Sequence, residues 1–142
     1  MMNSVVRKAW VVGLRSGRYK QGRLCLCQLT DYDEFQYNAK EDKRVYCCMG
    51  VLADIVNPDG WSNSDERPGR PYMFKVGDGI ESDDGTHAGG NAGGVYCLSN
   101  KLLNKIGLSA RKQDRLMAMN DGLTGRRYTF DEIADFIEGV DW

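Results

Sequence analysis

The chain has little histidine and no long apolar run, and these two absences limit its possible functions. Its 142 residues include one histidine, His87, so a catalytic dyad has a single candidate histidine base. No run approaches the ~20 apolar residues that span a bilayer. The N-terminal segment lacks the charged, apolar and small-residue order of a secretion signal. We therefore expect a cytosolic protein that has no membrane partner.

Acidic residues are missing from the first 30 positions. Six cations stand there instead: Arg7, Lys8, Arg15, Arg18, Lys20 and Arg23. The C-terminal segment shows the opposite pattern, because no cation follows Arg127. Its acids are Asp131, Glu132, Asp135, Glu138 and Asp141. This asymmetry predicts either an anionic ligand near the N-terminal segment or mutual pairing of the two ends.

Length and an apolar content of 42% fit one domain spanning residues 1–142. Apolar periodicity predicts several short helices. They are expected over 5–14, 48–56, 101–106, 110–119 and 130–138, with Ser99, Ser109 and the Thr129–Glu132 capping box at three of the starts.

Strands are expected over 24–29, 72–76 and 95–98, and residues 61–71 read as a loop. In the first strand, Leu24 and Leu26 should face one side and Cys25 and Cys27 the other. A long loop rich in glycine and acids occupies 77–94. The fold class is then α+β, with several short helices packed on a small, mostly antiparallel sheet.

The five cysteines allow three interpretations. They are Cys25, Cys27, Cys47, Cys48 and Cys97, and we expect them to be reduced in the cytosol. Cys47 or Cys48 could be a nucleophile at a helix start with His87 as its base. The set could also bind zinc, although neither C-x-C nor C-C is the usual C-x-x-C knuckle. The favoured interpretation is that they are small buried side chains, with no metal and no cofactor.

A basic segment, residues 15–23, has the inventory of a phosphate or nucleotide site. Arginine forks bind phosphate, and a base can stack on tyrosine or arginine. The candidate ligand-binding residues are Arg15, Ser16, Arg18, Tyr19, Lys20, Gln21 and Arg23. The alternative is a solvated basic turn whose Tyr19 packs on the core.

Three segments in order carry a family resemblance: W-x3-LRSG-x-Y-x-Q at 10–21, YCCMGVL at 46–52, and NDG with TF-x-EIAD-x-IE at 120–138. Together they resemble a family of small, mostly uncharacterised proteins of bacteriophages and prophages. The resemblance implies a host-takeover or counter-defence setting. It also adds Asn120 and Asp121 as candidate ligand-binding residues, which otherwise read as a helix terminus.

Three functional hypotheses follow. The first is a non-enzymatic sponge that sequesters an anionic small ligand, a linear or cyclic nucleotide immune signal, as a homo-oligomer in the host cytosol. The second is an inhibitor that binds a host enzyme through the acidic C-terminal face and the long loop. The third is a cysteine hydrolase or transferase that uses Cys47 or Cys48 with His87.

Overall fold

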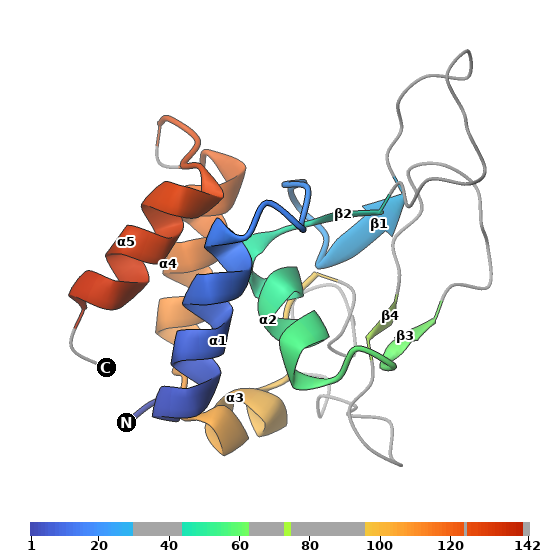
Figure 1. Ribbon diagram of the computed structural model, residues 1–142, viewed down its shortest axis with the longest axis vertical. Coiled ribbons are helices and arrows are strands. Elements are labelled where there is room, and N and C mark those ends of the chain that lie inside the picture. The colour runs from blue at the N-terminus through green and yellow to red at the C-terminus, as the bar shows by residue number, and fades with distance from the viewer. Residues whose placement is uncertain (30–43, 63–72, 75–95, 124, 141–142) are drawn as a thin grey trace.

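The computed structural model describes residues 1–29, 44–62, 73–74, 96–123 and 125–140, and it has the expected α+β composition (Figure 1). The helices in this part of the chain are α1 (Ser4–Arg15), α2 (Cys48–Val56), α3 (Asn100–Ile106), α4 (Ala110–Asp121) and α5 (Phe130–Gly139). The strands are β1 (Cys27–Leu29), β2 (Arg44–Tyr46), β3 (Trp61–Ser62) and β4 (Met73–Phe74). Within these residues, every helix is too short or too polar to cross a bilayer.

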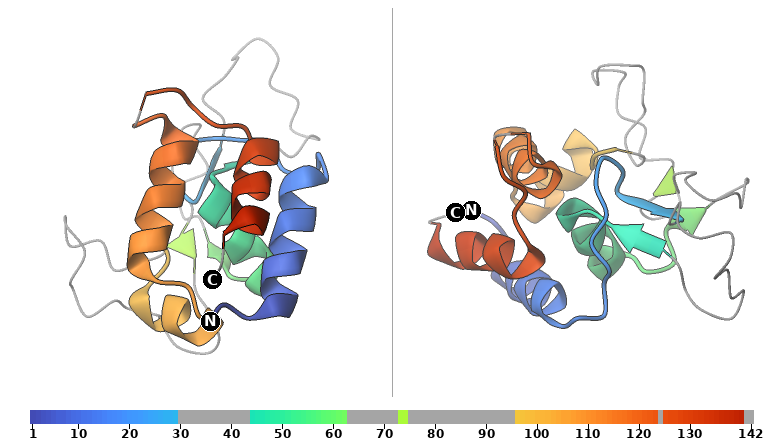
Figure 2. Two further views of the ribbon diagram at one scale, coloured as in Figure 1. Left: turned by 90° about the vertical axis from the view of Figure 1, so that its left-hand side faces the viewer. Right: turned by 90° about the horizontal axis from the view of Figure 1, so that it is seen from above.

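The helices enclose the core, with α1 packed between α2 and α5 and α4 packed against α2 and α5 (Figure 2). The central helix, α2, is apolar around its first turns and is almost wholly buried there. The Trp10 indole of α1 is also fully buried, and its Nε1 donates to the carbonyl of Cys48 at 2.9 Å. That hydrogen bond satisfies the polar atom of the ring while the rest of the ring fills the core.

Local signals place the helix ends where the sequence predicts them. The hydroxyls of Ser99 and Ser109 accept from the third backbone amide of their helices, and Thr129 and Glu132 form the expected capping box. α3 and α4 each end on a glycine with positive φ, Gly107 and Gly122. These caps depend on a few neighbouring residues, so they can be read without knowledge of the fold.

The strands form two antiparallel pairs, and both lie beside the helices (Figure 1). In the first pair, Cys27 lies opposite Tyr46 and Gln28 opposite Val45. The segment 20–22 runs along the other edge of β2. The Tyr46 amide donates to the Lys20 carbonyl at 2.9 Å, and the Gly22 amide donates to the Tyr46 carbonyl at 2.7 Å. β2 is therefore paired on both sides, and this brings the segment after α1 to the start of α2.

The expected strand over 24–29 is confirmed only in its second half, since Cys27–Leu29 is extended and paired and residues 24–26 are not. Leu24 has a φ of 72° and donates its amide to the Asp121 carboxylate at 3.0 Å. The expected alternation also fails. Leu24 is 58% exposed, whereas Cys25, Leu26 and Cys27 are all buried. The tertiary hydrogen bond to Asp121 outweighs the local preference for a strand.

Residues 96–98 are not a strand either. The side-chain amide of Gln113 donates to the Leu98 carbonyl, and its oxygen accepts from the Leu98 amide at 2.8 Å. A side chain thus satisfies the backbone groups that a neighbouring strand would have used. Trp61–Ser62, expected to be loop, forms β3 and pairs with β4 at Met73–Phe74. The loop expected at 77–94 lies outside the described residues.

Gly50 is a point where the fold admits no side chain. A Cβ there would lie 1.7 Å from the carbonyl oxygen of Leu26, a backbone atom that cannot move aside easily.

We predict that Gly50→Ala lowers the free energy of unfolding by at least about 3 kcal/mol, as measured by urea denaturation. Gly139→Ala is the control. A Cβ there meets nothing within 4 Å, so its stability should be unchanged or slightly higher. Equal stability of the two variants would contradict the close packing of α2 on residue 26.

Candidate functional site

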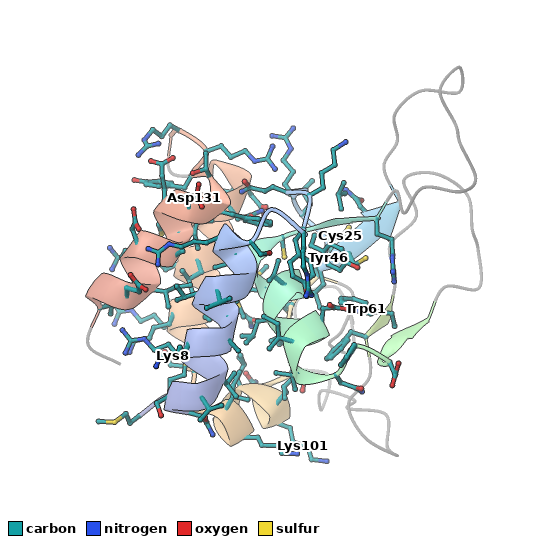
Figure 3. The ribbon with its side chains drawn as sticks, in the orientation of Figure 1. Lys8, Cys25, Tyr46, Trp61, Lys101 and Asp131 are labelled. Atoms are coloured by element: carbon teal, nitrogen blue, oxygen red, sulfur yellow. The ribbon has the colours of Figure 1, made fainter. Side chains whose placement is uncertain are left out.

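A polar pocket of about 260 Å³ opens where three segments meet. Arg18, Tyr19 and Lys20 come from the turn after α1, Arg44 and Tyr46 from β2, and Asp54 from α2. Figure 3 shows Tyr46, near Trp61, on the strand side of α2, away from Lys8 on the outer face of α1. Of the described lining residues, three are cations and one is an acid, so this part of the lining carries an excess of positive charge.

The cationic side chains meet at the pocket because β2 pairs with the backbone of residues 20–22. The hydrogen bonds between Tyr46 and residues 20–22 fix Lys20 beside the strand that begins at Arg44. Gly22 permits this approach, since a Cβ at that position would lie 2.6 Å from Cγ2 of Val45. Residues 24 positions apart in the sequence are thus held at one opening.

Asp54 and two tyrosine rings make the inner wall of the pocket, and Trp61 contacts Asp54 and Tyr46 beside it. The Tyr19 hydroxyl donates to one Asp54 oxygen at 2.6 Å, and the Trp61 indole donates to the other at 2.9 Å. Burial, together with the hydrogen bond to Asp54, raises the pKa of Tyr19, so the phenol stays protonated. Tyr46 packs edge-on between them, 5.1 Å from the Tyr19 ring and 5.9 Å from the Trp61 ring.

Arg18 is held over this wall rather than pointing freely into solvent. Its guanidinium carbon lies 5.3 Å from the centre of the Tyr19 ring, and Nη2 donates to the Tyr19 hydroxyl at 3.3 Å. Lys20 is exposed, and its side chain forms no ion pair with a described residue. The arrangement can bind an anion through charge-assisted hydrogen bonds, because among the described lining residues cations outnumber carboxylates.

The pocket gathers three of the residues expected to bind ligand, namely Arg18, Tyr19 and Lys20. Arg15 lies elsewhere, because its guanidinium is bound by Asp135 and Glu138 of α5. The Ser16 hydroxyl donates to the Gly13 carbonyl at 2.7 Å. Both Arg15 and Ser16 line a separate groove of about 640 Å³ on the outer face of α1. The two ends of the chain do pair at Arg15, which neutralises part of the acidic face considered for a host-protein inhibitor.

Gln21, Asn120 and Asp121 bind one another and the backbone rather than facing the pocket. Asn120 is fully buried; its oxygen accepts from Gln21 Nε2 and from the Cys48 amide, and its nitrogen donates to Asp121 and to the Gly22 carbonyl. Arg23 is exposed and does not line the pocket. The NDG motif thus joins the end of α4 to the segment 21–24 and to the start of α2.

The family model DUF8296, described as a domain of unknown function, matches residues 2–141. The chain belongs to this family. The match includes every residue of the pocket, so the pocket is part of the DUF8296 domain itself. No curated protein and no solved structure matches the chain.

Arg44, Tyr46 and Asp54 of the DUF8296 pocket were missed by the sequence reasoning, which assigned them no role. One signal for Asp54 was available, since it is the only charged residue in α2, which is otherwise apolar. A lone carboxylate on such a helix must find polar partners. Nothing in the sequence indicates that Arg44 lies beside Lys20, because that depends on the pairing along β2.

The thiols at the start of α2 are packed inside the DUF8296 domain. Cys47 caps the helix, its sulfur accepting from the Gly50 amide at 3.4 Å, and the Cys48 thiol donates to the Leu116 carbonyl at 3.5 Å. Burial raises the pKa of Cys47 to about 12 and that of Cys48 well above its usual value. Among the described residues, no group of three acids, cysteines or histidines could hold a metal. His87 lies outside them.

These pKa shifts predict slow alkylation, since the thiolate is the reactive form. With iodoacetamide near neutral pH, Cys47 and Cys48 of the native protein should stay unmodified while the half-exposed Cys97 reacts first. Peptide mass spectrometry gives the order. All five should react after denaturation in guanidinium, which serves as the control. Rapid native labelling of Cys47 or Cys48 would contradict the packing role and revive the cysteine-enzyme hypothesis.

The position of Asn120 predicts that it stabilises the domain. Asn120→Ala removes the side-chain acceptor of the buried Cys48 amide. It also removes one of the two hydrogen bonds of the Gln21 amide nitrogen and one of the two at the Gly22 carbonyl. We expect a loss of about 2 kcal/mol or more in the free energy of unfolding, measured in urea without any ligand. Asn104→Ala, at an exposed position of α3, should change it by less than about 0.5 kcal/mol. If both variants are as stable as the wild type, Asn120 has no such role.

Proposed function

We propose that this DUF8296 protein is a non-enzymatic binding protein that sequesters a small anionic ligand, a nucleotide, in the pocket between the turn after α1, β2 and α2. One observation carries the proposal: Arg18, Lys20 and Arg44 converge on an opening walled by tyrosine rings. Phosphate oxygens suit the cations, and a base or sugar can rest against an aromatic face. Sequestration needs tight binding but no catalytic group.

The biological setting belongs to the same proposal. The ordered motifs resemble proteins of bacteriophages and prophages, in which a nucleotide sponge would act in the host cytosol as a counter-defence factor against an immune signal. Such sponges commonly bury their ligand between subunits, and we therefore propose a homo-oligomer. Two findings favour this hypothesis over the cysteine enzyme: the thiols at 47 and 48 are buried, and the cations at 18, 20 and 44 border an open pocket.

The test is thermal denaturation with a panel of linear and cyclic nucleotides, because a ligand that binds only the native state raises the melting temperature. Isothermal titration then gives the affinity of any nucleotide that does so. We expect Lys20→Ala and Arg44→Ala each to weaken binding about tenfold or more, the size of a lost charge-assisted hydrogen bond. Native mass spectrometry of the protein purified from cells would show the oligomer and any co-purified nucleotide.

Arg111→Ala is the matched control. It also removes one positive charge, but from an exposed site on α4 that does not line the pocket. Its affinity should equal that of the wild type. The proposal fails if no nucleotide raises the melting temperature, or if nucleotide binding survives unchanged in both pocket variants.

A further inference from the structure

We infer that the pocket takes its nucleotide by a terminal phosphate group and binds a ribose hydroxyl at Asp54, so that linear nucleotides are preferred over cyclic ones. This inference rests on the proposed function and specifies the ligand of the same site. Three observations support this ligand independently: the charge of the pocket, its volume, and the free acceptor positions of the Asp54 carboxylate.

Charge is the first argument. Among the described residues that line the pocket, three cations, Arg18, Lys20 and Arg44, stand against the one carboxylate of Asp54. A phosphomonoester carries a charge of about −1.5 to −2 at neutral pH. A cyclic phosphodiester carries one negative charge and has one fewer free oxygen for arginine forks. The terminal group therefore matches both the charge and the number of donors at the opening.

Volume is the second argument. Sites that enclose a drug-sized ligand have about 300–1,000 Å³, and this pocket has about 260 Å³. It has room for a phosphate and its sugar but not for a whole cyclic dinucleotide. A ligand bound here would enter with one end, and a terminal phosphate is the end that fits the cations.

The acceptor capacity of Asp54 is the third argument. Each of its oxygens accepts one hydrogen bond from the protein, from Tyr19 and from Trp61. An ionised carboxylate has about four acceptor positions, so two remain for donors at the half-buried pocket wall. A phosphate at neutral pH offers few donors, but ribose hydroxyls offer two. In a 3′,5′-cyclic nucleotide the 3′ oxygen is esterified and cannot donate.

The experiment is isothermal titration of the full chain with matched pairs of probes, AMP with 3′,5′-cyclic AMP and GMP with 3′,5′-cyclic GMP, and with inorganic phosphate. We expect the linear member of a pair to bind about tenfold tighter, or more, than its cyclic partner. If the cyclic member binds equally or more tightly, the inference is overturned while the proposed function stands. If no nucleotide binds, both this inference and the proposed function are wrong.

A variant tests the contact at Asp54. Asp54→Asn keeps an oxygen for one of its two protein donors and removes the negative charge. The affinity for inorganic phosphate should hold or rise, while the advantage of the linear nucleotide over phosphate shrinks. Asp59→Asn is the control, because Asp59 is an exposed acid in the turn after α2. It should leave both the affinity for phosphate and the advantage of the linear nucleotide unchanged. If Asp54→Asn still binds the linear nucleotide more tightly than phosphate by the same factor as the wild type, the ribose contact is overturned. The titrations of the wild-type protein with the paired probes do not depend on the folding of any variant.

Discussion

The buried side-chain amide of Asn120 is the interaction on which the rest of this structure depends. It connects the end of α4 to the turn at Gln21 and Gly22 and to the first amide of α2, using both its oxygen and its nitrogen. A buried amide is costly unless its polar atoms are paired, and here each is paired twice. The same bonds fix the orientation of three segments that are distant in the sequence.

The pocket is a consequence of that arrangement. Once Gly22 is held by Asn120 on one side and by Tyr46 on the other, Lys20 must lie beside β2 and near Arg44. Asp54 then supplies the acceptor that orients Tyr19 and Trp61. Residues that bind one another deep in the domain thus determine where the exposed cations stand, and a charged opening results from an uncharged core contact.

The sequence predicted what depends on near neighbours. Helix starts at Ser99, Ser109 and Thr129 and the α+β class are confirmed, since each cap needs only three or four consecutive residues. It failed where a distant side chain takes the place of a strand, as Gln113 does at Leu98 and Asp121 does at Leu24. Of the pocket, it could identify the cations after α1 but not Arg44 or Asp54. Their positions follow from pairing along β2 and from packing of α2, which no local pattern encodes.

The bonds of Asn120 also order events during synthesis of the chain. Its partners at Gln21 and Cys48 lie 99 and 72 residues earlier. The described residues of the pocket therefore leave the ribosome well before the Asn120 amide that aligns them. Until α4 has emerged, Arg18, Lys20 and Arg44 belong to an unassembled nascent chain, and the pocket is complete only when α4 has packed against α2. The pocket is thus completed late in the biogenesis of the protein, although the residues that line it are made well before α4.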